Sequence, residues 1–321
     1  MTDRKPNEAA NRKQSIPTDF QVEPSMMQQT PRCRDHAVDI HSHIIPGVDD
    51  GAQTLEEAEE LAFLAREEGM DIVFATPHYG IENGYAPKKE LIRSQLEKLQ
   101  ERISYQCDCP NAQVFLGTEW YCSDEIVDRI RNREAFPMGS SDWYMVEFLE
   151  WGNTTEPADI MIYRLAKMQL AGIHTILAHP ERYKAIQQDW DLAKRICDLG
   201  VRLQINAYDL CLNKNQATRD LAQWMAQEHL ISFLGSDMHG TRIKKDGRPA
   251  RRPQMKEGIR WLYEHVDQEY ADDVVRRNAE KYLGIPKLPV VERRDGPFRS
   301  TLPHNPIFVM MPSTVTPGCV T

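Results

Sequence analysis

The chain has 321 residues, of which 41% are hydrophobic and 27% are charged, as in an ordinary globular protein with a sizeable core. One large domain is compatible with this length, because α/β barrels typically run to about 250 residues. The net charge of −9 argues against a general nucleic-acid-binding protein, and the lack of any run of about 18 apolar residues argues against direct membrane insertion.

The two ends of the chain differ from its middle in composition. Residues 1–35 are polar and show no period, so we expect a mostly disordered N-terminal extension without a signal peptide. Residues 285–321 are rich in proline and predict an irregular tail. Seven scattered cysteines suit a reducing compartment, and we expect a cytoplasmic protein with a single folded domain over residues 36–284.

A repeated pattern runs through that domain. Each short apolar run predicts a buried strand, ends in a polar residue of the kind that binds metals, and is usually followed by a helical segment. Thr54, for example, opens a helix as an N-cap with Glu57 three residues later. This alternation predicts a parallel sheet in an α/β fold, and we expect seven strands, at residues 38–41, 72–78, 114–119, 143–147, 175–179, 202–206 and 231–239.

The polar residues at the strand ends are candidate metal ligands. His41 and His43 are two residues apart on extended chain, so their side chains point to the same face. Buried together, such imidazoles and carboxylates would be costly unless they were paired or coordinated, and their number implies two or three ions. The candidate metal ligands are His41, His43, Asp50, His78, Glu119, Glu147, His179, Asp237 and His239.

This ligand chemistry favours hydrolysis by bound metals. Mixed nitrogen and oxygen ligands suit manganese, iron or zinc better than copper(I) or magnesium. Such a site hydrolyses phosphate esters or amides. Arg182 offers a planar fork for a phosphate, although pairing with Glu181 is the simpler alternative. No cysteine is followed by an arginine six residues later, which argues against the cysteine-dependent tyrosine phosphatases.

Seven short motifs resemble the polymerase-and-histidinol-phosphatase (PHP) superfamily. Within it they are most similar to the manganese-dependent protein-tyrosine phosphatases of bacterial capsule and exopolysaccharide operons. The resemblance covers roughly residues 35–284 and implies a distorted seven-stranded (β/α) TIM-like barrel of the PHP type. The motifs are Asp39-Ile-His-Ser-His43 with Val48-Asp-Asp-Gly51, Thr76-Pro-His78, Gly117-Thr-Glu119, Val146-Glu147-Phe148, Ala178-His-Pro-Glu-Arg182 and Ser236-Asp-Met-His239.

The resemblance also implies an arrangement of ligands around three manganese ions, with iron or zinc as alternatives. One ion would be held by His41, His43, Glu119 and Asp237, the second by Glu119, Glu147 and His179, and the third by Asp50, His78 and His239. Asp49 is the alternative to Asp50, because sequence alone does not separate two neighbours. Glu119 would bridge two ions.

Two arginines would bind the substrate phosphate in such an enzyme. Arg182 matches the first. The second follows the Asp-x-His ending in the family, but here the loop over residues 240–252 is longer. Arg252, which precedes Pro253, is the better match, and Arg248 is the alternative.

The resemblance implies hydrolysis of phosphotyrosine on a bacterial tyrosine kinase that regulates polysaccharide assembly. A homo-oligomer is compatible with the sequence. Two other functions stay open: a PHP-type phosphatase of a small molecule such as histidinol phosphate, and a non-catalytic scaffold that binds the kinase. An amidohydrolase-type deaminase is disfavoured because no candidate for the carboxylated lysine of that class stands out.

Overall fold

The computed structural model describes residues 37–82, 84–106, 113–151, 154–242 and 250–287. Nine parallel strands are built from the seven predicted runs, because the second and third runs are each broken into two pieces. Residues 76–77 separate β2 from β3, and residues 117–118 separate β4 from β5. The strands are β1 (Ala37–Ser42), β2 (Met70–Ala75), β3 (His78–Tyr79), β4 (Gln113–Leu116), β5 (Glu119–Tyr121), β6 (Trp143–Glu147), β9 (His174–Ala178), β10 (Arg202–Asn206) and β11 (Ile231–Gly235).

The strands close into a parallel barrel. β1 pairs with β2 and β2 with β4, while the other sheet runs β3, β5, β6, β9, β10 and β11. Two backbone hydrogen bonds join the first and last strands: Asp237 N donates to His41 O at 2.8 Å, and His43 N donates to Met238 O at 2.9 Å. The second and third runs therefore cross from one sheet to the other, which distorts the barrel.

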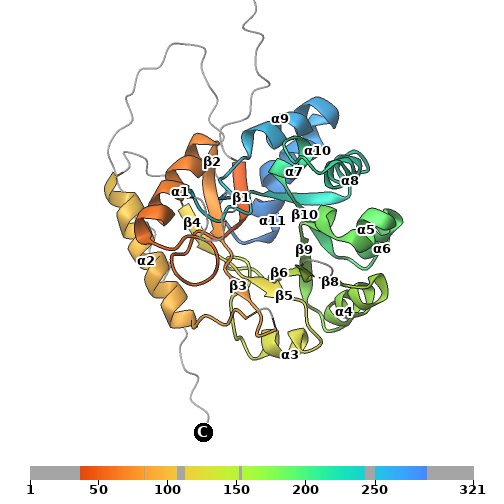
Figure 1. Ribbon diagram of the computed structural model, residues 1–321, viewed down its shortest axis with the longest axis horizontal. Coiled ribbons are helices and arrows are strands. Elements are labelled where there is room, and N and C mark those ends of the chain that lie inside the picture. Colours follow the sequence, from red (N-terminus) through yellow and green to blue (C-terminus); the bar gives the residue numbers. More distant parts are fainter. Residues whose placement is uncertain (1–36, 83, 107–112, 152–153, 243–249, 288–321) are drawn as a thin grey trace, which may run out of the picture.

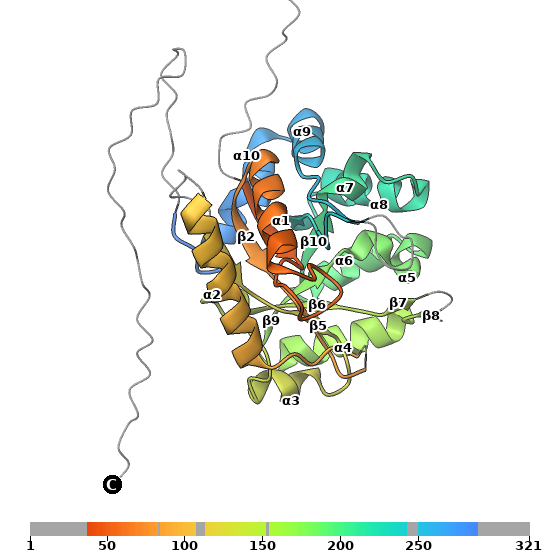
Figure 2. The ribbon, with the colours of Figure 1, turned by 60° about the vertical axis from the view of Figure 1, so that its left-hand side comes forward.

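Helices form an outer layer around the strands, as Figure 1 shows. Figure 2 shows α1 and α2 side by side on one flank, where they contact each other. β7 (Glu150–Trp151) and β8 (Thr154–Thr155) form a small antiparallel pair. The helices are α1 (Leu55–Glu67), α2 (Lys89–Gln106), α3 (Ile126–Arg131), α4 (Ala158–Leu170), α5 (Lys184–Gln188), α6 (Asp191–Asp198), α7 (Ala207–Cys211), α8 (Gln216–Gln227), α9 (Lys256–His265), α10 (Gln268–Asp272) and α11 (Asn278–Tyr282), with short 3-10 and π turns at Pro180–Arg182 and Asp273–Arg277.

The strands are buried on both faces, as parallel strands covered by helices require. Alternate residues such as Ile72 and Phe74 belong to one buried cluster. Their neighbours on the strand, Val73 and Ala75, belong to a larger cluster that includes residues of the helices. The Thr54 side chain accepts a hydrogen bond from Glu57 N at 3.2 Å, so the predicted N-cap is present.

The prediction of a parallel α/β barrel with metal-type residues at one end is confirmed in its architecture. The two predicted extensions, 1–35 and 285–321, lie outside the described residues apart from 285–287. Within the part of the chain that the structure describes, no helix is long and apolar enough to cross a membrane.

Candidate metal and phosphate site

Eight of the nine predicted metal ligands lie at the carboxyl ends of β1, β2, β4, β6, β9 and β11 or within four residues of them, and Asp50 lies in the loop that follows β1. His78 and Glu119 are also the first residues of β3 and β5. The carboxyl ends of the strands are where α/β barrels place their reactive groups. Two of them, His179 and Asp237, have φ angles of 37° and 52°. These left-handed conformations are uncommon for residues other than glycine and often occur at functional sites. They turn the chain sharply at the ends of two strands.

Glu119 lies at the centre of the group. Its Oε2 is 3.1 Å from His41 Nε2, and 3.2 Å from His43 Nε2. The same atom is 3.1 Å from His78 Nδ1, and Oε1 is 2.9 Å from His179 Nε2. Burial would raise the pKa of Glu119, but the His41 and His78 imidazoles outweigh it and hold that pKa well below its usual value. Glu119 is therefore a buried carboxylate with imidazoles on several sides.

Groups outside the cluster orient the two histidines of the first motif. His41 Nδ1 lies 2.9 Å from Gln204 Oε1, and His43 Nδ1 lies 2.8 Å from Asp49 Oδ2. Each oxygen accepts a hydrogen bond from Nδ1, and, against the effect of burial, nearby carboxylates raise the pKa of both rings. When a metal replaces the proton on Nε2, the remaining proton stays on Nδ1 and Nε2 is the nitrogen that faces the site. The two Nε2 atoms are 3.2 Å apart, as expected of two ligands aimed at a common ion.

His239 is oriented in the same way. Its Nδ1 donates to the backbone oxygen of Asp237 at 2.8 Å, and its Nε2 lies 3.4 Å from Asp50 Oδ1. Burial, with Arg251 and His43 nearby, lowers the pKa of His239 to about 3, so the ring is neutral. A neutral imidazole with its lone pair turned inward is the form that binds a metal.

Three groups of these side chains are close enough to hold an ion: His43 with Asp50, His78 and His239; His41 with His43 and Glu119; and His78 with Glu119 and Glu147. The ligand atoms of each group lie within 4.8 Å of one another. Glu119 Oε2 and His179 Nδ1 are buried and make no hydrogen bond to any described residue. Buried polar atoms of this kind, in a mixed nitrogen and oxygen donor set, fit divalent metal ions such as manganese, iron or zinc.

The grouping differs in detail from the one implied by the resemblance. His78 lies beside Glu147, with Nδ1 2.9 Å from Oε1, although we expected the two in different sets. His179 contacts Glu119 as expected, and Asp237 Oδ1 lies 3.5 Å from His43 Nε2.

The structure separates the two neighbouring aspartates of the Val48-Asp-Asp-Gly51 motif. Asp50 belongs to a possible ion group through His78 and His239. Asp49 Oδ2 instead accepts a hydrogen bond from His43 Nδ1, on the side of the ring opposite Nε2. Asp49 also accepts hydrogen bonds from the backbone N of Gly51 and of His78, at 2.9 and 3.1 Å. This geometry favours Asp50 as the ligand and gives Asp49 an orienting role.

Arginines flank the metal cluster on one side. Arg182 Nη1 donates to Asp237 Oδ2 at 2.6 Å, and Nε donates to Asp209 Oδ2 at 3.0 Å. It does not pair with Glu181, whose Oε1 accepts a hydrogen bond from Asn206 N at 2.9 Å. Arg182 therefore faces the cluster, as the phosphate-binding interpretation requires.

The second arginine differs from the sequence expectation. Arg252 Nη2 donates to Thr241 O at 3.1 Å. Arg251 instead contacts Asp237 Oδ2 through Nη1. The physical reason lies in the backbone, because His239 N donates to Arg251 O at 2.8 Å and so brings Arg251 beside the end of β11. Arg248, the alternative, lies outside the described residues.

Sequence reasoning missed a polar chain on β10. Gln204 Nε2 donates to Asn206 Oδ1 at 2.9 Å, and Asn206 Nδ2 donates to Asp237 Oδ2 at 3.3 Å. Because Gln204 Oε1 also contacts His41 Nδ1, this series of hydrogen bonds connects the first and last candidate metal-binding motifs. The available signal was the pattern Gln204-Ile205-Asn206, because two amides on the same face of a buried strand require polar partners.

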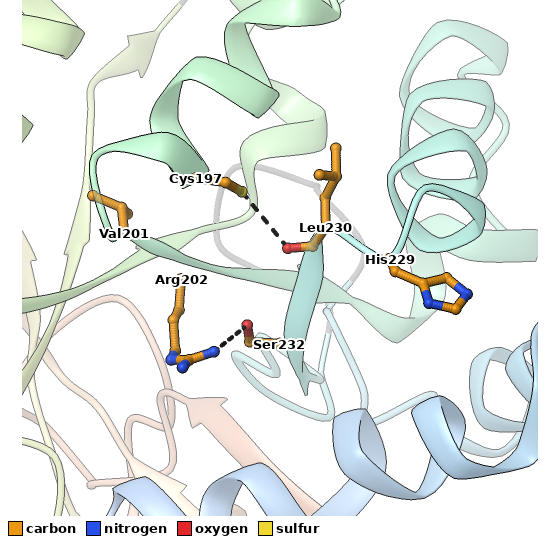
Figure 3. A pocket seen from close by; sticks show the side chains of 7 residues that line it. Cys197, Val201, Arg202, His229, Leu230 and Ser232 are labelled. Atoms are coloured by element: carbon orange, nitrogen blue, oxygen red, sulfur yellow. Dashed lines mark hydrogen bonds between the residues drawn. The ribbon is translucent and has the colours of Figure 1, made fainter.

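A cavity of about 260 Å³ lies at the amino ends of β10 and β11, whereas the cluster lies at their carboxyl ends. Figure 3 shows two hydrogen bonds among the residues that line it: Arg202 Nη1 donates to Ser232 Oγ at 3.3 Å, and the Cys197 thiol donates to Leu230 O at 3.8 Å. Burial raises the pKa of Cys197 to about 11, which makes it a poor nucleophile. This cavity contains none of the predicted site residues.

Comparison with known proteins identifies the family. The sequence model described as "Capsular polysaccharide synthesis, CpsB/CapC" matches residues 37–284, which include every described residue of the metal cluster. The chain belongs to the CpsB/CapC family. The match ends close to the predicted boundaries of the folded domain.

Individual members of the CpsB/CapC family support this assignment. The chain is 26% identical over 257 residues to the tyrosine-protein phosphatase CpsB of Streptococcus agalactiae, covering 77% of this chain and 98% of that protein. It is 27% identical over 208 residues to the tyrosine-protein phosphatase YwqE of Bacillus subtilis, covering 64% and 79%. A solved structure from work on YwqE of B. subtilis and CpsB of Streptococcus pneumoniae, described there as metal-dependent tyrosine phosphatases, shares the fold, with a TM-score of 0.66, 24% identity and coverage of 77% and 94%.

Proposed function

We propose that this protein is a metal-dependent protein-tyrosine phosphatase of capsule or exopolysaccharide synthesis. The observation that carries the proposal is the convergence of nine metal-type side chains and two arginines on the carboxyl ends of the strands in a CpsB/CapC chain. Its substrate is a phosphotyrosine protein, which we propose to be the tyrosine kinase that controls polysaccharide assembly. Manganese is the proposed metal, bound as two or three ions.

The side chains divide the work between metal binding and phosphate binding. His41, His43, Asp50, His78, Glu119, Glu147, His179, Asp237 and His239 would hold the ions. When bound, divalent ions supply Lewis-acid stabilisation of phosphate oxygens and a nucleophile derived from water at neutral pH. Glu119, buried at the centre, contacts His41, His43, His78 and His179.

Arg182 and Arg251 would hold the phosphate. Both guanidinium groups contact Asp237 Oδ2 through Nη1. A planar guanidinium can bind two phosphate oxygens through two parallel N–H donors. Arg251 thus takes the role that the sequence assigned to Arg252. A tyrosine leaving group needs no strong general acid, because the pKa of a phenol is about 10, far below that of an alkyl alcohol.

A substrate comparison tests the proposal. The full chain, stripped with chelator and reloaded with manganese, would be assayed on a phosphotyrosine peptide and on histidinol phosphate. We expect hydrolysis of the phosphotyrosine peptide at the higher kcat/KM, and we expect Glu119→Ala to abolish it and to lower bound metal in elemental analysis. Faster hydrolysis of histidinol phosphate would indicate a small-molecule phosphatase. Kinase binding without hydrolysis of either substrate would indicate a scaffold.

A further inference from the structure

Arg182 is fixed at two edges of its guanidinium group. Nη1 donates to Asp237 Oδ2 at 2.6 Å on the side of the metal cluster, and Nε donates to Asp209 Oδ2 at 3.0 Å on the other side. The Arg182 side chain is 28% exposed, whereas Asp209 is fully buried. An exposed arginine on a flexible stem would sample many rotamers, and the second anchor restricts this freedom.

Asp209 is itself held in place. It lies on α7, which begins directly after β10, and its Oδ1 accepts a hydrogen bond from Asn213 Nδ2 at 2.6 Å. Arg182 uses the other oxygen, so two donors fix the plane of the carboxylate. Asp209 belongs to none of the three groups that can hold an ion among the described residues. Its contact with the site runs through Arg182.

We propose that Asp209 is a positioning residue that aims Arg182 at the substrate phosphate. This inference rests on the proposed function. Asp209 occupies the Nε edge of the fork, which leaves the Nη edge to face Asp237 and the phosphate. Rates of oriented reactions depend steeply on such placement, and a shift of about 1 Å can cost roughly a hundredfold. In this structure Nε is held by Asp209 and not by the neighbouring Glu181, whose Oε1 accepts a hydrogen bond from Asn206 N.

The test combines Asp209→Asn and Arg182→Ala in a double-mutant cycle. An amide at Asp209 keeps the shape but no longer offers a charged acceptor to Nε. We expect kcat/KM on a small aryl phosphate to fall about tenfold to a hundredfold in Asp209→Asn, and the inhibition constant of inorganic phosphate to rise by a similar factor. In the Arg182→Ala background, Asp209→Asn should change neither value by more than about twofold, because coupled residues are non-additive. Bound metal should stay at the parental value, and Tm is measured in parallel because the substitution weakens a buried charge-assisted hydrogen bond.

Two further variants guard against a general loss of folding. Asp198→Asn alters an exposed carboxylate on α6 and should behave as the parent. Asn213→Ala keeps the Asp209 charge but removes the donor to Oδ1, and we expect a smaller rise in the phosphate inhibition constant. If Asp209→Asn does not fold, the same cycle is run with Asn213→Ala, and parental phosphate inhibition in that variant overturns the inference.

The outcomes separate this inference from the proposed function. Loss of activity in Arg182→Ala with parental behaviour in Asp209→Asn overturns the positioning role alone. An equal loss from Asp209→Asn with and without Arg182 shows a structural role and also overturns it. Parental activity in Arg182→Ala overturns both the phosphate-binding role of Arg182 and the role of Asp209. A parent protein that does not hydrolyse phosphotyrosine overturns the proposed function itself.

Discussion

The imidazole of His43 is held from outside the metal cluster by Asp49, whose Oδ2 lies 2.8 Å from His43 Nδ1. The neighbouring Asp50 faces the other way, toward His78 and His239. The two adjacent carboxylates thus contact different imidazoles of the site. One orients a histidine, and the other is placed to bind an ion directly.

This difference predicts distinct phenotypes for the two aspartates. Asp49→Ala should lower metal affinity about tenfold to a hundredfold, as loss of an outer-shell partner usually does, while excess manganese should restore much of the activity. Asp50→Ala should lose activity that excess manganese does not restore, because a ligand atom is missing. Elemental analysis and kcat/KM at graded manganese concentrations measure both. Full rescue of Asp50→Ala with no rescue of Asp49→Ala would reverse the assignment.

The arginines after β11 give a second prediction. Arg251→Ala should lower kcat/KM on a small aryl phosphate by about tenfold or more, because a charge-assisted hydrogen bond contributes roughly 1.5–3 kcal/mol. Arg252→Ala is the matched control, since its guanidinium donates to the Thr241 carbonyl. It should stay within about threefold of the parent. A larger loss in Arg252→Ala than in Arg251→Ala would restore the assignment that the sequence favoured.

The sequence predicted the fold well because buried parallel strands leave a strong local signal. Runs such as residues 175–179 are apolar, end in a ligand-type residue and precede a helix. The same signal located the nine candidate ligands at one end of the barrel, although their role as ligands is still a prediction. The breaks that divide two runs into β2, β3, β4 and β5 left no clear signal, because they depend on how the barrel closes.

Other features of the site depend on contacts between distant parts of the chain. Asp49 and Asp50 have the same chemistry, and only the position of His43 separates them. The choice of Arg251 over Arg252 depends on the backbone hydrogen bond from His239 N to Arg251 O, between residues that are 12 positions apart in the sequence. Asp209 lies 27 residues from Arg182, and no motif links the two.

Alkylation of thiols and chelation of metal should have different effects on the activity of this protein. Burial raises the pKa of Cys122 to about 12 and the pKa of Cys211 to about 11. Such thiols carry little thiolate at neutral pH. Alkylation with iodoacetamide should therefore leave activity largely intact, whereas EDTA should remove it and manganese should restore it. Inactivation by alkylation that bound substrate prevents would instead indicate cysteine chemistry.

The last prediction concerns Gly235, the final residue of β11, which packs directly behind the first metal-binding histidine. A Cβ atom at this position would lie 2.5 Å from His41 Cβ and 2.8 Å from Gln204 Nε2. The His41 and Gln204 side chains are buried and hydrogen-bonded to each other, so neither can move without breaking the contact that orients His41. Gly235→Ala should cost about 1–3 kcal/mol of stability through overpacking, and it should also lower bound metal.

Leu221→Ala on α8 is the control, because it creates a cavity in a buried helix face and should lower Tm without lowering the metal content of the folded protein. Elemental analysis and Tm of the two variants separate local displacement of His41 from a general loss of stability, and parental metal content in Gly235→Ala would contradict this account of His41.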